Sequence, residues 1–324
     1  MAHSLISTTS CIAILTTIGS GAFAGNLDLS IADPVVTPPI AGCLGGRTLD
    51  LRAGVLRSDN VWADDIASLD GGDGFGGANV SDKLGLGDAE GGFGSGQYTW
   101  DRCGSDIAVG AGFASTSMDE AEDINFFGDT AISDDVDFQF FDVEYGRPIR
   151  DKSRGFVGLR VLNFESNSVF STSEDSYFTA DFPAGDSLVS TAKFTGIGPR
   201  AGAEFNTSDG QAGSFGVFGA ASAALLYGER NNEVEGNVRF SDADSASEAS
   251  YEAVLNFEAE LGVSYNITDV SVVKFGINYM QINDMDWASG SDFVGDMLVD
   301  DEFIDLEAGD RSFVGAFVGL EIAF

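Results

Sequence analysis

The end of the chain, residues 311–324, alternates strictly between apolar and mixed positions. From Val314 every second residue is apolar as far as Phe324, and Glu321 is one of the residues between them. A period of two is that of a β-strand with one continuous apolar face. A bacterial outer-membrane barrel typically ends on such an aromatic strand, whereas a soluble sheet rarely leaves its last residue as an exposed Phe. The stretch therefore predicts a membrane-spanning strand.

The same period recurs along the chain and predicts ten strands, with eight or twelve as alternatives. The expected strands are residues 48–57, 92–102, 105–117, 137–149, 155–165, 190–205, 213–228, 251–266, 270–283 and 311–324. Tyr251 and Tyr265 stand at the two ends of one outward face, as the aromatic girdles of a membrane barrel do. Residues 234–241 are expected to extend a hairpin beyond the membrane.

The connections between these strands alternate in length. Long acidic segments at 58–90, 118–136, 166–189, 229–250 and 284–310 alternate with short turns. This pattern indicates an up-and-down barrel with long extracellular loops and short periplasmic turns. Because an open sheet edge in lipid leaves backbone groups unpaired, the sequence predicts an all-β, closed, antiparallel transmembrane barrel in which 48–57 pairs with the last strand. A secreted β-sandwich is the alternative, but its loops need not alternate in length.

Two segments precede the single barrel domain, which we place at residues 47–324. Residues 1–24 contain an apolar stretch and end in the small-residue pattern AFA, which predicts a secretory signal peptide. Residues 25–46 hold half of the six prolines, in ADPVVTPPIAG, and predict an extended periplasmic lead-in. Glycine (42 residues) and phenylalanine (26 residues) are abundant, which suits close-packed strands with aromatic belts.

The cysteines and the one histidine limit the chemistry. Cleavage of the signal would remove Cys11 and His3, which leaves Cys43 and Cys103 in an oxidising compartment. Both would lie on the periplasmic side, and we hypothesise a disulfide between them. Without histidine, serine and cysteine triads and most zinc sites are excluded. We therefore expect no enzyme, no catalytic residue, no metal site and no cofactor.

The charge is strongly negative, with 52 acidic residues, 16 basic residues and a formal net charge of −36. This balance excludes nucleic acid as a partner. Dense acidic groups occur at 119–123 and 296–302 without the spacing of an EF-hand. They have two interpretations: solvated loop charge, or loops that collect divalent cations.

One short connection is basic instead. Arg147, Arg150, Lys152 and Arg154 fall in a single predicted periplasmic turn. These side chains either contact the phospholipid headgroups of the inner leaflet or simply anchor the barrel at the interface. Outer-membrane lipid is therefore an expected partner, and the oligomeric state is left open.

Charges within the strands alternate with the outward apolar positions, so we expect them to face the lumen. A charge that faced lipid at mid-depth would cost about 2–4 kcal/mol. The expected lumen-lining residues are Asp50, Arg52, Asp142, Glu144, Arg160, Arg200, Glu204, Glu258, Glu260, Lys274 and Glu321. Two interpretations are open: an ion path with an acidic bias, or a closed, interlocked polar core. Eight strands leave a filled interior and sixteen a channel, so ten lie nearer the filled end.

Four strand sequences carry a family resemblance. FFDVEYGRPI, GFVGLRVLNF, FTGIGPRAGAEF and FGVFGAASAALLYGER resemble the major-outer-membrane-protein-like family of pore-forming proteins first described in Legionella, most specifically at 194–202 and 224–228. The resemblance covers residues 137–228 and implies a bacterial outer-membrane β-barrel. It also implies a porin-like passive channel for ions or small hydrophilic solutes, and no catalytic residues. The alternative is a non-conducting barrel with a structural or adhesive role.

Overall fold

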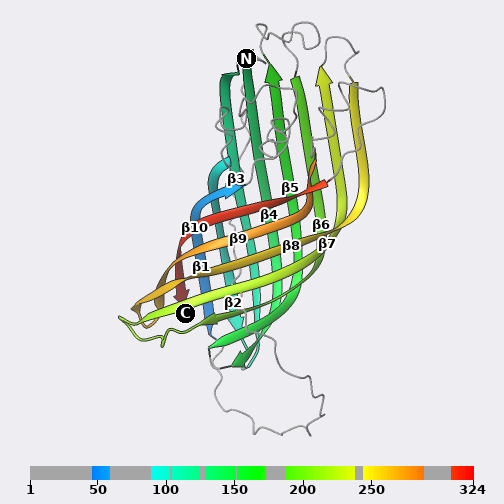
Figure 1. Ribbon diagram of the computed structural model, residues 1–324. Helices are drawn as coiled ribbons and strands as arrows, with labels where there is room; N and C mark the ends of the chain where they lie inside the picture. The colour runs from blue at the N-terminus through cyan, green and yellow to red at the C-terminus, as the bar shows by residue number, and fades with distance from the viewer. Residues whose placement is uncertain are drawn as a thin grey trace, which may run out of the picture.

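The computed structural model describes residues 46–58, 89–102, 104–124, 128–150, 152–172, 187–237, 244–287 and 308–324. Its strands are β1 (Arg47–Ser58), β2 (Ala89–Asp101), β3 (Asp106–Ile124), β4 (Gly128–Arg150), β5 (Ser153–Thr172), β6 (Ser187–Asn206), β7 (Phe215–Asn237), β8 (Asp244–Thr268), β9 (Ser271–Trp287) and β10 (Ala308–Ala323). They form one closed barrel in the order β1-β10-β9-β8-β7-β6-β5-β4-β3-β2 (Figure 1). The predicted all-β antiparallel barrel of ten strands is confirmed.

The barrel closes through the first and last strands, as expected. β1 pairs antiparallel with β10, with Leu51 opposite Leu320 and Asp50 opposite Glu321. Every strand therefore has a hydrogen-bonded neighbour on both sides at this level, which a sheet in lipid requires. Among the described residues, no helix is long and apolar enough to cross a membrane. The predicted signal peptide, nearly all of the lead-in, and both Cys43 and Cys103 lie outside the described residues.

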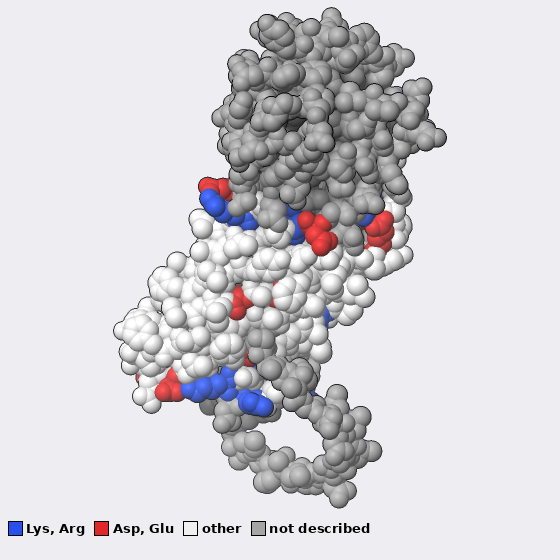
Figure 2. Space-filling view, in the orientation of Figure 1, with Lys and Arg blue, Asp and Glu red and all other residues white. Residues whose placement is uncertain are grey.

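The outer face carries an apolar band bounded by aromatic rings. Tyr227 and Tyr251 stack at one border, with ring centroids 6.2 Å apart. Phe215 and Tyr265 contact each other at the other border, with centroids 4.7 Å apart. Figure 2 shows the band as a largely white surface between two rows of charged residues. Aromatic girdles of a membrane barrel lie at its two membrane–water interfaces. The two ring pairs therefore mark these interfaces on the β7–β8 side of the barrel.

Many phenylalanines lie inside the barrel, in addition to the aromatic side chains on its outer face. Phe164, Phe194, Phe218 and Phe313 are almost fully buried there. Their rings, and those of their neighbours, lie over glycines: a Cβ on Gly112 would stand 2.3 Å from Cζ of Phe140. The abundance of glycine and phenylalanine therefore reflects an aromatic interior as well as a membrane surface.

Six strands, β3 to β8, continue well past the band, so three of the predicted loops are wrong in extent. Residues 118–124 belong to β3 and 128–136 to β4, and they pair from Met118↔Asp134 to Ile124↔Gly128. β5 runs to Thr172, while β7 and β8 continue up to Asn237 and from Asp244. Polar residues on both faces of these segments predicted loops. In the structure each segment is hydrogen-bonded to a neighbouring strand, so the sheet continues beyond the apolar band. Figure 1 shows these teal, green and yellow strands rising above the others. Of the hairpin expected at 234–241, residues 234–237 belong to β7 and the rest lie outside the described residues.

Candidate functional site in the barrel interior

The interior of the barrel is built in three layers, which can be followed along β4. Its inward side chains are Glu144 and Asp142 toward the end with the short turns, then Phe140 and Phe138, then Asp134. We name these the charged layer, the aromatic layer and the upper polar layer. Strict alternation places every second residue of β4 inside, so the order of residues along the strand sets the order of the layers.

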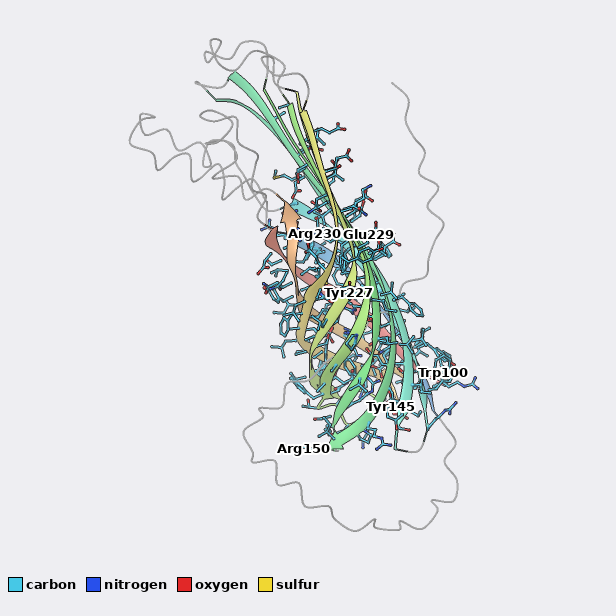
Figure 3. The ribbon with its side chains drawn as sticks, turned by 90° about the vertical axis from the view of Figure 1, so that its right-hand side faces the viewer. Trp100, Tyr145, Arg150, Tyr227, Glu229 and Arg230 are labelled. Atoms are coloured by element: carbon cyan, nitrogen blue, oxygen red, sulfur yellow. The ribbon has the colours of Figure 1, made fainter. Side chains whose placement is uncertain are left out.

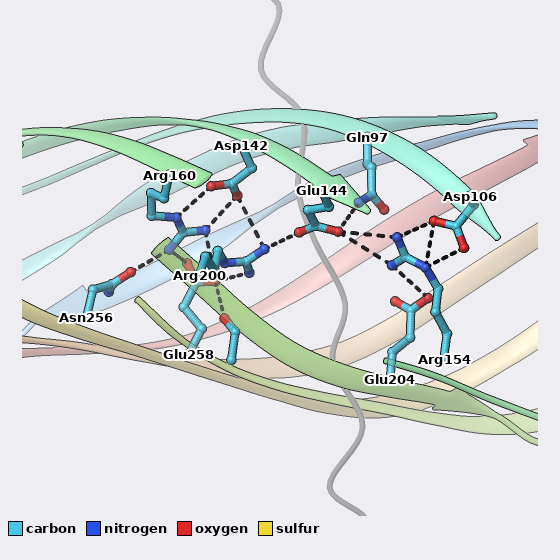
Figure 4. A network of polar contacts seen from close by, with 11 residues as sticks. Gln97, Asp106, Asp142, Glu144, Arg154, Arg160, Arg200, Glu204, Asn256 and Glu258 are labelled. Carbon is cyan, nitrogen blue, oxygen red and sulfur yellow. Dashed lines mark hydrogen bonds and ion pairs between the residues drawn. The ribbon is translucent and has the colours of Figure 1, made fainter. Parts of the chain in front are cut away.

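One half of the charged layer is centred on two arginines (Figure 4). Arg160 on β5 binds Asp142 on β4 with two hydrogen bonds of 2.8 Å. It also reaches Glu258 on β8, with Nη1 2.6 Å from Oε1. Arg200 on β6 shares Glu258, with Nη2 2.8 Å from Oε2, and pairs with Glu144. β6 and β7 separate β5 from β8 in the barrel wall, so these contacts cross the interior.

The other half of the charged layer joins β1, β8, β9 and β10. Arg52 binds Asp50 on its own strand, with Nη2 2.9 Å from Oδ2, and pairs with Glu260 on β8. Lys274 on β9 lies 2.6 Å from Asp50 Oδ2 and 2.6 Å from Glu321 Oε2. Each carboxylate here therefore has a cation partner, as buried charge requires.

Ten of the eleven residues expected to line the lumen take part in these two groups of contacts, and the eleventh, Glu204, pairs with Arg154. Seven strands supply them, and their side chains face inward. Glu204, Glu258 and Glu321 are partly accessible and the others are buried. These inward side chains are partners of one another in ion pairs.

Two members of the charged layer were not expected inside: Asp106 and Arg154. Arg154 Nε lies 2.8 Å from Asp106 Oδ2, and its Nη1 lies 3.2 Å from Glu204 Oε1. The predicted fifth strand begins at residue 155, which leaves Arg154 in the turn. Arg154 has the same parity as Arg160, so the alternation itself carried the signal.

The predicted basic turn is therefore not a single cluster. Lys152 pairs with Asp209 in the β6–β7 connection, with Nζ 2.5 Å from Oδ1. This hydrogen bond and the lysine charge lower the pKa of Asp209. Arg147 and Arg150 are exposed, while Arg154 turns inward. Only part of the cluster therefore remains available to a partner.

The aromatic layer lies above the charged layer in the interior. Phe138 on β4 meets Phe313 on β10 edge to face, with ring centroids 5.0 Å apart. Phe317 on β10 contacts Phe93 on β2 and Phe218 on β7, at 6.3 and 6.1 Å. The layer also covers the charges below: the Arg52 guanidinium lies 5.1 Å from the ring centre of Phe317, a distance typical of a cation–π contact.

The upper polar layer adds a further link across the barrel. Arg311 on β10 pairs with Asp134 on β4, and both side chains are fully buried. Ser58 Oγ and Thr116 Oγ1 lie 3.1 Å apart, between β1 and β3. Sequence reasoning missed this layer, because Asp134 was placed in a loop and Arg311 at the edge of the last strand.

Described residues line two cavities in this interior. The larger, of about 360 Å³, opens at the end with the short turns and is lined by residues such as Asp50, Glu204 and Lys274. The smaller, of about 40 Å³, lies between the charged and aromatic layers. Three of its lining oxygens are buried without a hydrogen-bond partner: Ser95 Oγ, Glu260 Oε1 and Asn278 Oδ1.

The acidic groups do not form a metal site within the described residues. In that part of the chain, no three His, Cys, Asp or Glu side chains are arranged to hold an ion. Residues 119–123 belong to β3 rather than to a loop. The second acidic group, at 296–302, lies outside the described residues, so loop-bound cations remain a prediction there.

Comparison with known proteins identifies the family. The model of the Legionella pneumophila major outer membrane protein precursor matches residues 88–324. No curated protein matches the chain. Three solved structures are similar in fold. The outer membrane protease OmpT of Escherichia coli is 11% identical, with 86% of this chain and 96% of that chain covered and a TM-score of 0.39.

The translocator domain of the autotransporter NalP of Neisseria meningitidis is 12% identical, with 88% and 90% covered and a TM-score of 0.36. The toluene transporter TodX of P. putida is 8% identical, with 87% and 91% covered and a TM-score of 0.36. Identities this low concern the fold and say nothing of activity. The family match, which spans most of the chain including β2 to β10, carries the assignment. The chain belongs to the Legionella major outer membrane protein family and is a β-barrel of the bacterial outer membrane.

Proposed function

We propose that this protein is a non-conducting outer-membrane barrel whose role is structural or adhesive. The observation that carries the proposal is the contact between Phe138 and Phe313 across the interior. Ion pairs that also cross the interior lie below it, at Arg160–Glu258, and above it, at Arg311–Asp134. An ion entering from either end would have to break buried pairs and displace aromatic rings, which opposes passive flow.

The second part of the proposal concerns display at the cell surface. β7 passes the border marked by Tyr227 and continues to Asn237, which adds roughly 30 Å of extended chain. Figure 3 shows Tyr227, Glu229 and Arg230 with strands continuing beyond them, away from Trp100 and Tyr145. A hairpin surface of this length, held rigidly by its backbone ladder, suits contact with another surface.

A porin-like passive channel is the other candidate. The cavity of about 360 Å³ at the periplasmic mouth favours it, because solutes can enter the barrel that far. In the charged layer, carboxylates also outnumber lysine and arginine side chains. A channel lined in this way would favour the passage of cations over that of anions. The cavity ends at the charged layer, however, and we therefore rank the channel second.

We also propose that the protein is not an enzyme. Glu258 and Glu260 are the carboxylates closest in sequence to an acid–base pair. Glu258 accepts from Arg160 and Arg200, and Glu260 accepts from Arg52. Both oxygens of Glu258 are therefore already engaged by guanidinium groups, which leaves neither of them available to a substrate.

Single-channel recording in planar bilayers tests the proposal. Pure, folded protein should give no discrete ohmic steps at salt concentrations where a matrix porin conducts. Reproducible steps from the folded form would overturn the closed barrel and restore the passive channel. A change of ion selectivity on reversing the charge of Glu258 would then assign the path to the charged layer.

A further inference from the structure

The cations of this acidic chain are not evenly matched with carboxylates. All but two of the 16 lysines and arginines lie in the described part of the chain. Within that part, each has a carboxylate oxygen within 4 Å, with four exceptions. The exceptions are Arg47, Arg102, Arg147 and Arg150. In a chain with 52 acidic residues, four unmatched cations call for an external partner.

These four arginines lie at one end of the barrel. Arg47 begins β1, Arg102 follows β2, and Arg147 and Arg150 end β4. All four are exposed. This is the end with the short turns, which in outer-membrane barrels faces the periplasm. Figure 2 shows a row of blue atoms along this lower edge of the white band.

Three of the four stand on the outer, lipid-facing side. Arg47 has the parity of the outward residues of β1, Arg102 that of the outward residues of β2, and Arg147 that of the outward residues of β4. Arg150 instead lines the mouth of the larger cavity. The three outward arginines therefore form an arc over β1, β2 and β4, with β3 between the last two, at the border between the apolar band and the periplasm.

Aromatic side chains complete this arc. Trp100 is opposite Arg47 in the β1–β2 register, and its ring centre lies 4.4 Å from that of Tyr98. Arg147 donates a hydrogen bond of 2.8 Å to the hydroxyl of Tyr145 and lies 5.4 Å from its ring centre. Figure 3 shows Trp100 and Tyr145 near Arg150 at this end. Aromatic rings with guanidinium groups beside them are typical of the headgroup level of a membrane.

Among the described residues, no nearby carboxylate forms an ion pair with these three arginines, and Asp101, beside Arg102, lines the larger cavity. Asp106 is held by Arg154, which points into the barrel, and Asp209 is held by Lys152. At the opposite border, by contrast, the outward cations are already matched: Arg57 pairs with Glu90 and Lys193 with Glu165. Outward cations are therefore unmatched at the border near the short turns and matched at the opposite border. This difference points to a ligand that is present only at the border near the short turns.

We propose that Arg47, Arg102 and Arg147, with Tyr98, Trp100 and Tyr145, bind the headgroup of an anionic phospholipid in the periplasmic leaflet. Guanidinium groups bind phosphate oxygens in paired hydrogen bonds, and the acyl chains of such a lipid would lie along the apolar band directly above. We favour a lipid over a free phosphate as the ligand because the site is continuous with the apolar band. The proposal is independent of whether the barrel conducts.

The test compares lipid binding to the full-length mature protein, folded in detergent, by native mass spectrometry. Phosphatidylglycerol and phosphatidylcholine are supplied as probes at equal concentration. Each arginine near a charged headgroup contributes about a fivefold gain, so removal of three should lower phosphatidylglycerol binding on the order of a hundredfold. The test variant is Arg47→Gln/Arg102→Gln/Arg147→Gln, and the matched control is Arg57→Gln, an outward arginine of β1 at the opposite border.

The expected result is a preference of the wild type and Arg57→Gln for phosphatidylglycerol, and its loss in the triple variant. Heat-modifiable gel mobility verifies that each barrel is folded, and the single variants Arg102→Gln and Arg147→Gln serve if the triple variant does not fold. Equal binding of the two lipids by the wild type would overturn the site, as would unchanged binding in the arginine variants. Displacement of the lipid by inorganic phosphate at the same concentration would show a phosphate site rather than a lipid site and would also overturn it.

Discussion

Arg160 on β5 and Glu258 on β8 form an ion pair across the barrel, with Nη1 2.6 Å from Oε1, and the two residues are 98 positions apart in the sequence. Glu258 simultaneously accepts from Arg200 on β6. One carboxylate thus ties three strands together inside the barrel. The pairs are buried, so their value depends on complete partnering rather than on the number of charges.

Removal of this carboxylate should destabilise the folded barrel. Glu258→Gln leaves two buried guanidinium groups with one partner fewer, and we expect a loss of about 3–5 kcal/mol in the free energy of unfolding. Urea unfolding in lipid vesicles, followed by tryptophan fluorescence, measures it. The control is Glu165→Gln, which breaks the exposed pair with Lys193 and should change stability by less than about 1 kcal/mol. Equal effects of the two substitutions would contradict the cross-barrel role.

The aromatic layer should be the barrier to ions. In Phe138→Ala/Phe313→Ala the ring contact across the interior is removed, and we expect discrete conductance steps that the wild type lacks. Each substitution should also lower stability by about 3–5 kcal/mol, so folding is verified in the same preparation. Phe141→Ala is the control, because Phe141 lies on the same strand but faces outward. A silent double variant that is folded would place the barrier in the charged layer or the upper polar layer.

The small cavity should contain ordered water. Ser95 Oγ, Glu260 Oε1 and Asn278 Oδ1 line it without protein partners, and its volume of about 40 Å³ has room for roughly three water molecules. A high-resolution crystal structure should show density within hydrogen-bond distance of these oxygens. A crystal soaked in a rubidium salt distinguishes a cation by its anomalous signal. An empty cavity, or a rubidium peak, would contradict the expectation.

The stability of the β6–β7 connection should depend on pH through the titration of Asp209. The hydrogen bond from Lys152, then its charge, lower the pKa of this exposed carboxyl group. A lowered pKa contributes stability above the unfolded pKa, near 3.9, and that contribution is lost as the pH falls through the folded pKa. A carboxyl ¹³C titration should therefore give a lower midpoint in the wild type than in Lys152→Gln. Arg150→Gln should retain the wild-type midpoint, and identical midpoints in all three would refute the pairing.

The sequence by itself determined which side of the wall each residue occupies. A strand repeats every two residues, so the outward positions of β10 and the inward charges of β1, β4 and β8 followed from local order alone. The closure of the barrel could be predicted as well, because an open sheet edge in lipid would leave backbone N–H and C=O groups without hydrogen-bond partners. The same reasoning could have placed Arg154 inside, had the fifth strand begun two residues earlier.

Only the tertiary structure decided what meets inside the barrel and how far the strands extend. The partner of an inward residue depends on the stagger of ten strands around the barrel, which no local pattern encodes; this is why the Arg160–Glu258 and Phe138–Phe313 contacts were not predicted. The extended parts of β3 to β8 were hidden for a related reason. In water both faces are polar, so alternation disappears, and only the backbone ladder between neighbouring strands maintains the sheet.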